Sequence, residues 1–496
     1  MLARIKPLAT ILAEGADAQH GLKRSLGPWA LCAMGIGAII GTGIFVLTGV
    51  ASATRAGPSI TLSFVVAGIA SALAALCYAE VSSKIPISGS AYTYTYATFG
   101  EILAWIIGWD LVLEYALGAS TVSVGWSGYF VNILSQFGLV IPDVWTHSHW
   151  DATPGIANLP AAAIIFVITA LLVRGTRESG TVNAIIVSIK LLIVLFFIVV
   201  GIGHIDGANY HLPAGPLTGL GGFFPFGYSG MLGGAAFIFF AYIGFDAVST
   251  TAEEAKNPAR DLPFGIISSL IVCTILYIIV VAILNGMVPF YKLNVAFPVA
   301  FAMSYAGLPW ASVIISLGAI AGLTTVLLVM MFGQSRVFFA MSRDGLIPRA
   351  FTTVHPVWRT PWISQIVFGI LIAAAGAIFP INILGSLTNM GTLSAFVLTS
   401  LAVPLLRRRH PELQSAFTVP LGPYVIPVLS ALAALGLMYF LKVGNPLVWG
   451  FFPLVWLWFL IWLAAGLVFY FAYGRNKSTV ALQEAERLAP VQPRVN

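Results

Sequence analysis

The feature that most constrains this chain is a series of apolar windows, each about 20 residues long, which recurs from residue 29 to residue 473. A helical window of this length matches the hydrocarbon thickness of a bilayer. Only 8% of the residues are charged, against roughly 25% in a soluble domain. We therefore expect an all-α integral membrane protein with twelve transmembrane helices, at 29–51, 59–82, 101–130, 159–174, 182–203, 232–252, 264–288, 310–340, 362–379, 385–406, 424–442 and 450–473.

Basic residues are distributed unevenly between the two sides that these windows define. With the N-terminus placed inside, twenty of the 24 Lys and Arg residues fall in inside segments, and Lys190 lies within a span. Only Arg55, Lys292 and Lys442 fall outside. Positive residues gather on the cytoplasmic side of membrane proteins. The sequence therefore predicts a multi-pass protein of the cell (plasma) membrane with both termini cytoplasmic, and the net charge of +6 reflects orientation rather than a nucleic-acid partner.

The first span is interrupted by glycines near its middle. Gly41-Thr42-Gly43 places two weak helix formers around a hydroxyl, inside an apolar run that begins at Gly35. In hydrocarbon, free backbone N–H and C=O groups are tolerated only where they are buried in protein or face a cavity or ligand. A helix that restarts after this break would point its free N–H groups at an anion such as a substrate carboxylate. The alternative is that these glycines serve only close helix packing.

The sixth span is interrupted in the same way, by Gly244 and Asp246 at mid-depth. A break there would release the carbonyls of Phe240, Ala241 and Ile243 as acceptors for a substrate ammonium. Breaks in the first and sixth spans are typical of a transporter built from two inverted five-helix repeats. Donors for a carboxylate together with acceptors for an amine describe an α-amino acid.

Carboxylates also occur inside the predicted spans. Glu114 in the third span and Asp246 in the sixth are costly in hydrocarbon, so each should face protein or water and have a partner. Three roles stay open for Glu114: it could hold a cationic substrate group, carry a proton or bond a neighbouring helix. Glu80, which precedes a Pro/Gly/Ser-rich run, marks either the cytoplasmic mouth of a pathway or an ordinary polar loop.

Lys190 is the one base inside a span and lies too deep to reach the interface comfortably. Desolvation disfavours its ammonium while carbonyl or carboxylate partners favour it, so its charge can depend on conformation, which is the property a proton-coupling group needs. The alternative is a permanent ion pair with Glu114 or Asp246. In the eighth span, we expect the hydroxyls of Thr324 and Thr325 to face the first span, and Leu323 to limit the room for a substrate side chain.

Nothing in the sequence indicates a metal or a cofactor, and the proton gradient would be the driving ion. Cys32, Cys77 and Cys273 all fall in predicted spans, which is typical of buried thiols. His147 and His149 form only a weak metal pattern in a loop. No paired-aspartate, nucleophile-base or metal-ligand spacing favours an enzyme.

Four segments carry a resemblance to a known family, namely 35–49, 78–92, 244–258 and 342–346. With these segments the chain resembles the amino acid-polyamine-organocation superfamily, above all a bacterial form of its cationic amino acid transporter branch. The resemblance implies a five-plus-five inverted-repeat (LeuT-like) fold with helices 1 and 6 broken at mid-membrane, two further helices and alternating access. The implied divisions are a cytoplasmic segment 1–28, a first repeat 29–204, an outer loop 205–231, a second repeat 232–406, helices 11 and 12 within 407–474, and a cytoplasmic tail 475–496.

The resemblance also implies roles for single residues. The N–H groups of Thr42 and Gly43, beside Ile40, would bind the substrate carboxylate. The carbonyls in the sixth span, those of Phe240, Ala241 and Ile243, would bind its amine. Lys190 matches a helix 5 lysine that, in proton-coupled relatives, takes the place where sodium-coupled members of the fold hold a cation between helices 1 and 8.

We therefore expect a proton-coupled symporter of small neutral L-amino acids such as alanine, because bulky Leu323 leaves little room for arginine or lysine. Glu114 and Asp246 would then be network or proton groups. The alternatives are a cationic amino acid transporter and an amino acid exchanger. The expected partners are a free amino acid, the proton and membrane lipid, with no nucleic acid, and the sequence leaves open a small accessory membrane subunit.

Overall fold

The computed structural model describes residues 4–7, 26–87, 90–151, 153–175, 180–212, 221–413, 415–448 and 452–482. Within these ranges the regular structure is helical, apart from a hairpin of β1 (Leu447–Val448) and β2 (Phe452–Pro453). Five parts of the sequence discussed above lie outside the described residues: most of the segment 1–28, residues 88–89, residues 213–220 of the predicted outer loop, residues 450–451 of the last predicted span, and the end of the tail from 483 onward.

Eight helices in the described part of the chain are long and apolar enough to cross a membrane, and shorter apolar helices accompany them. The long ones are Gly43–Lys84, Glu101–Gln136, Ile185–His204, Gly227–Ala252, Pro258–Met287, Pro309–Arg343, Ile381–Arg409 and Leu454–Lys477. The shorter ones are α2 (Pro28–Ile39), α8 (Leu159–Arg174), α14 (Trp362–Ile378) and α16 (Val425–Phe440). Every predicted window overlaps one of these helices, so the all-helical membrane architecture is confirmed.

Several of the long helices are composed of more than one element. The first contains η1 (Gly43–Leu47), α3 (Thr48–Ala51), η2 (Ser52–Ala56), η3 (Gly57–Ser59) and α4 (Ile60–Lys84). The second consists of α6 (Glu101–Val112), η4 (Leu113–Leu117) and α7 (Gly118–Gln136), and the third is formed by α9 (Gly180–Gly201) and η6 (Ile202–His204). The fourth is formed by α10 (Gly227–Ile238), η8 (Phe239–Tyr242) and η9 (Asp246–Glu254). The last consists of α17 (Leu454–Phe469), η12 (Tyr470–Gly474) and α18 (Arg475–Lys477).

Three long helices are continuous, namely α11 (Pro258–Met287), α13 (Pro309–Arg343) and α15 (Ile381–Arg409). Short helices that no apolar window predicted occupy the connections: α5 (Ser90–Thr98), η5 (Asp143–Trp145), η7 (Gly207–Tyr210), η10 (Phe290–Lys292), α12 (Pro298–Tyr305) and η11 (Arg349–Thr352). These segments have four or fewer helical turns, which is too short for a bilayer window to detect.

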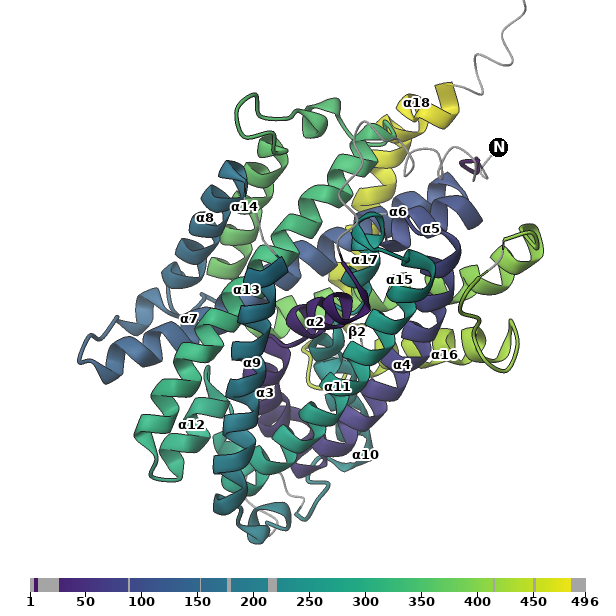
Figure 1. The fold of residues 1–496 in the computed structure, drawn as a ribbon. Helices are drawn as coiled ribbons and strands as arrows, with labels where there is room; N and C mark the ends of the chain where they lie inside the picture. The colour runs from purple at the N-terminus through teal and green to yellow at the C-terminus, as the bar shows by residue number, and fades with distance from the viewer. Residues whose placement is uncertain are drawn as a thin grey trace, which may run out of the picture.

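Helix α2 lies at the centre of the bundle, where it packs against α9, α11 and α13 (Figure 1). Its contact with α11 depends on small residues. A Cβ atom at Gly35 would lie 2.4 Å from Oγ of Ser269, and one at Gly265 would lie 2.8 Å from Cβ of Leu31. Small residues allow two helices to approach closely in a membrane, where lipid is as apolar as a leucine side chain. The first helix is therefore enclosed by protein rather than by lipid.

The two described ends of the chain lie on the same face of the bundle (Figure 1). The guanidinium of Arg4 donates a hydrogen bond of 2.9 Å to the carbonyl of Arg475. The N–H of Glu101, at the start of α6, donates one of 2.8 Å to the carbonyl of Arg4. The described segments near the two ends of the chain are therefore in direct contact.

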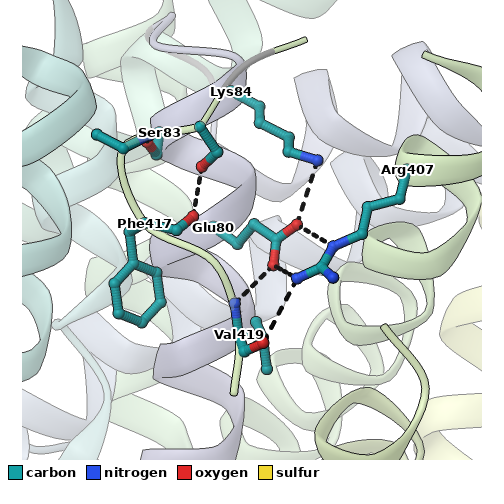
Figure 2. Close-up of polar contacts among 8 residues, drawn as sticks. Glu80, Ser83, Lys84, Arg407, Phe417 and Val419 are labelled. Carbon is teal, nitrogen blue, oxygen red and sulfur yellow. Dashed lines mark hydrogen bonds and ion pairs between the residues drawn. The ribbon is translucent and has the colours of Figure 1, made fainter. Parts of the chain in front are cut away.

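Glu80 forms a junction between α4, α15 and the segment before α16 (Figure 2). Its carboxylate is fully buried and accepts hydrogen bonds from Nε of Arg407 at 2.6 Å and from the N–H of Val419 at 2.8 Å. The ammonium of Lys84 lies 3.2 Å from the same carboxylate. With two cations and a backbone donor, the carboxylate is satisfied by the protein itself, so this structure favours a joining role over the mouth of a pathway.

Replacing Arg407 tests this junction. Arg407→Met leaves the buried Glu80 carboxylate with Lys84 and one N–H, and we expect a loss of about 1.5–3 kcal/mol in unfolding free energy. Thermal unfolding of the purified protein in detergent should show a lower midpoint. Arg408→Met, on the same helix at a solvent-exposed position, is the matched control and should leave the midpoint unchanged. Equal midpoints for both variants would contradict the role of the junction.

Candidate functional site at two broken helices

The first helix is broken directly after α2. The backbone leaves the helical conformation at Ile40, where φ is −71° and ψ is 99°, and helical structure resumes from Thr42 into the π-helical turn η1. Gly41, in the break, faces α13, because a Cβ atom there would lie 3.2 Å from a methyl of Val326. The hydroxyl of Thr42 is buried and has no hydrogen-bond partner among the described residues. The break is where the sequence predicts it.

The sixth helix is broken between η8 and η9. Ile243 is extended with ψ of 135°, and Gly244 has φ of +121°. A side chain rarely adopts that backbone conformation, and a Cβ atom at Gly244 would also lie 2.8 Å from the carbonyl carbon of Ala38. Only glycine fits this position, for both reasons.

The two breaks are in direct contact. A Cβ atom at Gly43 would lie 2.2 Å from Cα of Ala241, so the two backbones touch at this point. The contact brings together six of the nine residues that the sequence predicts around a substrate, all six of them buried: Ile40, Thr42, Gly43, Phe240, Ala241 and Ile243.

Several backbone groups at the breaks have no partner outside the helices. Beyond the helices' own ladders, no hydrogen bond among the described residues uses the N–H of Thr42 or Gly43. The same holds for the carbonyls of Ala241 and Ile243, whereas the carbonyl of Phe240 accepts a bond of 3.2 Å from the N–H of Ile243. The site therefore presents N–H donors from helix 1 and carbonyl acceptors from helix 6.

The ammonium of Lys190 lies at the carbonyl end of α2. It donates hydrogen bonds of 2.6 Å to the carbonyl of Gly37 and 3.2 Å to that of Ile40. These carbonyls are left free by the break, and the C-terminal end of a helix attracts a cation. The side chain is 1% exposed, and its methylenes pack against Gly322 of α13, where a Cβ atom would lie 3.3 Å from them.

Lys190 has no acidic partner in the described part of the chain, because neither Glu114 nor Asp246 forms an ion pair there. The predicted hydroxyl groups of α13 make other bonds. Thr324 donates to the carbonyl of Ile320 at 2.7 Å, and Thr325 donates to that of Gly322 at 2.8 Å. A bond from Lys190 to either hydroxyl stays a prediction for another conformation.

Side chains that the sequence analysis did not single out satisfy further carbonyls at the breaks. Tyr277 of α11 donates a bond of 2.8 Å to the carbonyl of Ile39, and Tyr129 of α7 donates one of 2.7 Å to that of Phe45. Asn389 of α15 donates to the carbonyls of Ala236 and Phe237, at the end of α10. A mid-span asparagine or tyrosine is the only signal that could have indicated these groups, and it does not identify the partner.

Glu114 of η4 and Asp246 of η9 lie close to each other. Glu114 lies in η4, a π-helical turn of the kind often found at functional sites, and both carboxyls are 1% exposed. The two carboxyls lie close enough to interact with each other, and the phenol groups of Tyr78 and Tyr115 lie within electrostatic range of both. Neither oxygen of Glu114 has a basic or N–H partner in the described residues. No cation neutralises this pair there.

Leu323 is fully buried in the stretch of α13 that lies along the first break. It lies between Gly322, which packs on Lys190, and Val326, which packs on Gly41. The hydroxyl of Thr324 accepts a bond of 3.0 Å from the indole N–H of Trp126 on α7. This bond joins α7 to α13 beside the two breaks.

Comparison with known proteins gives matches over nearly the whole chain. Residues 26–474 match the family model described as amino acid permease. The chain is 49% identical over 475 residues to a branched-chain amino acid permease of Bacillus subtilis (strain 168), covering 94% of this chain and 96% of the relative. It is 47% identical over 477 residues to the methylthioribose transporter of the same organism, covering 96% and 98%. It is 39% identical over 418 residues to the vacuolar cationic amino acid transporter 4 of Arabidopsis thaliana, covering 83% and 68%.

A change at Gly43 tests the contact between the breaks. Gly43→Ala forces a methyl into the backbone of Ala241, and overpacking of this kind costs roughly 1–3 kcal/mol. We expect a lower thermal unfolding midpoint for the purified variant. Gly436→Ala, inside α16 with no atom within 4 Å of the added Cβ, is the matched control and should unfold at or above the midpoint of the parent protein, because alanine favours the helix more than glycine does. A Gly43→Ala protein as stable as the control would show that the two backbones do not touch.

Proposed function

The chain belongs to the amino acid permease family within the amino acid-polyamine-organocation superfamily, and from this premise we propose proton-coupled uptake of small neutral amino acids by alternating access. The chain is a transporter and not an enzyme. The observation that carries the proposal is the contact of two broken helices that present N–H donors on one side and carbonyl acceptors on the other.

An α-amino acid matches these groups. Its carboxylate would accept bonds from the N–H groups of Thr42 and Gly43, at the positive end of the half-helix that starts there. Its ammonium would donate to the carbonyls of Ala241 and Ile243, with Phe240 beside them. In the interior of a membrane protein, such groups gain more from a ligand than they would in water, because unpaired polar groups are costly there.

Lys190 is the group we propose for proton coupling. Its charged form joins α9 to the carbonyl end of α2, and a charged donor forms hydrogen bonds about twice as strong as a neutral one. Protonation would therefore stabilise the arrangement seen here, in which α2 ends against Lys190. A preference of about 1.4 kcal/mol corresponds to a tenfold change in the population of that arrangement.

The carboxyl pair supports a second proton site within the same proposal. Two adjacent carboxyls in a dry site cannot both be ionised at low cost, so Glu114 and Asp246 would share a proton. The pair also favours the second candidate function, transport of cationic amino acids, because a substrate ammonium or guanidinium could replace that proton. Leu323 and the neutral substrate in the name of the 49% identical relative favour neutral substrates.

We propose the topology that the basic residues predict, with twelve helices, a five-plus-five inverted repeat and both termini cytoplasmic. The contact of Arg4 with Arg475 supports common placement of the termini. The excess of Lys and Arg in the segments on that side supports the cytoplasm.

The experiment that tests the function is uptake of labelled substrates into proteoliposomes, with and without an inward proton gradient. The panel is alanine, leucine, arginine and methylthioribose, which covers the substrates named for the relatives. We expect alanine uptake to rise with the gradient and arginine uptake to remain near background. Strong arginine uptake that ignores the gradient would instead favour a cationic amino acid facilitator. Counterflow without accumulation would favour an exchanger.

Lys190→Ala tests the coupling mechanism. Without the ammonium, the contact between α9 and the end of α2 no longer depends on protonation. We therefore expect alanine accumulation under a proton gradient to fall to the level seen without a gradient. Exchange of labelled for unlabelled alanine should persist, since the proposed substrate groups are unchanged. Lys292→Ala, which removes an exposed lysine, is the control. An undiminished response to the gradient in Lys190→Ala would refute the mechanism.

A further inference from the structure

Arg55 is a buried cation that the proposed mechanism does not use. It lies in η2, in the last turn of the half-helix that starts at Gly43, and is 1% exposed. All three of its guanidinium nitrogens are buried without a hydrogen-bond partner in the described part of the chain. No ion pair among those residues includes Arg55. A guanidinium carries five N–H donors, so its requirement for acceptors is large.

Two segments of the chain lie against the guanidinium. Its central carbon lies 4.0 Å from the centre of the Phe237 ring, on α10. On another side is Gly444, where a Cβ atom would lie 3.0 Å from Nε of Arg55. Gly444 has a φ of +76°, a conformation that favours glycine, in the turn between α16 and β1. A larger residue there would meet the arginine side chain, so a glycine at this turn is what lets the guanidinium lie beside it.

The described part of the chain offers no carboxylate to this group. The undescribed stretches 213–220 and 449–451, in the connections next to α10 and β1, contain no Asp or Glu. Stacking on Phe237 is worth about 0.5–2 kcal/mol, and the carbonyl end of the half-helix contributes about 0.3–1 kcal/mol. Burial of an ion costs several kcal/mol. The protein contacts therefore offset only part of the cost, and an anion would offset the rest.

The position of Arg55 connects it with the substrate groups. Phe237 precedes Phe240 by one helical turn, so the ring under the guanidinium stands directly next to the break in helix 6. Arg55 follows Gly43 by twelve residues, about 18 Å of helix. It therefore lies at the other end of the half-helix whose start carries the proposed donors for the substrate carboxylate.

We propose that Arg55 binds a small monovalent anion, namely the carboxylate of the amino acid substrate before it reaches the helix breaks. This rests on the proposed function, because the carboxylate is that of the transported amino acid. The guanidinium binds a carboxylate through two parallel N–H donors, with the Phe237 ring as a floor. Chloride has the same charge and is the other source of this chemistry, and the experiment separates the two.

The first experiment measures the thermal unfolding of the purified protein in a buffer free of chloride and sulfate, in which the only anion is the bulky sulfonate of the buffer itself, with added acetate, chloride or alanine. A ligand that binds the folded state raises the midpoint. We expect acetate and alanine to raise the midpoint of the parent protein and of Arg55→Lys, and acetate to have no effect on Arg55→Gln. A response to chloride alone would show that the site binds chloride and not a carboxylate. No response to any of these anions would overturn the proposal. The acetate result does not depend on amino acid transport, so it separates failure of the site from failure of the proposed function.

Arg55→Gln also tests whether the guanidinium is unpaired. If no group of the chain compensates the charge, its removal leaves the anion-free midpoint unchanged or raises it. A variant that fails to fold, or that unfolds well below the parent protein without anions, would show an internal partner and overturn the proposal.

A second measurement uses transport. We expect Arg55→Gln to raise the KM for alanine roughly tenfold, the effect of losing about 1.4 kcal/mol of binding, with less than a twofold change in kcat. Arg55→Lys should stay closer to the parent value. Lys442→Gln, which removes a cation stacked on Tyr439, controls for net charge and should leave KM unchanged. An unchanged KM in Arg55→Gln would exclude a role for this site in substrate binding.

Discussion

The backbone contact between Gly43 and Ala241 determines the rest of the central structure. Two interrupted helices can meet in a bilayer only if the peptide groups released by each interruption find partners, because hydrocarbon offers none. Lys190 and Tyr277 satisfy carbonyls at the end of α2, and Asn389 satisfies those at the end of α10. The groups left over lie on the facing sides of the two breaks, so the packing itself selects which peptide groups are available to a ligand.

This division of partners has a mechanical consequence. The carbonyl end of α2 is bound by side chains from α9 and α11, whereas the half-helix after the break is bound by Tyr129 of α7. α11 also holds the second half, through the bond from Asn285 to Ser52, but Lys190 of α9 bonds only to the end of the first half. A change in the charge of Lys190 acts on the first half alone, and the break allows that half to move without carrying the other.

Periodicity and composition predict the positions of the helices and of both breaks, because glycine and buried charge interrupt an apolar run in a way that depends only on local sequence. They do not predict which side chains meet. Glu114 and Asp246 are 132 positions apart, and Tyr277 reaches Ile39 across 238 positions. Such partners depend on the rotation of each helix about its axis, which a nearly uniform apolar surface leaves undetermined. The alternative of an ion pair between Lys190 and an acid could be decided only once that rotation was known.

Two buried cations, Lys190 of α9 and Arg55 of η2, lie at the ends of the two halves of helix 1, and they show why burial alone does not define a role. The ammonium of Lys190 donates hydrogen bonds to carbonyls at the end of α2, so its acceptors are part of the protein itself. The guanidinium of Arg55, at the end of the second half-helix, meets a ring and a glycine turn, which provide contact without acceptors. A cation whose partners are internal can respond to protonation. A cation without them holds its charge at neutral pH and can respond only to a ligand that brings acceptors, because a guanidinium does not lose its proton in proteins.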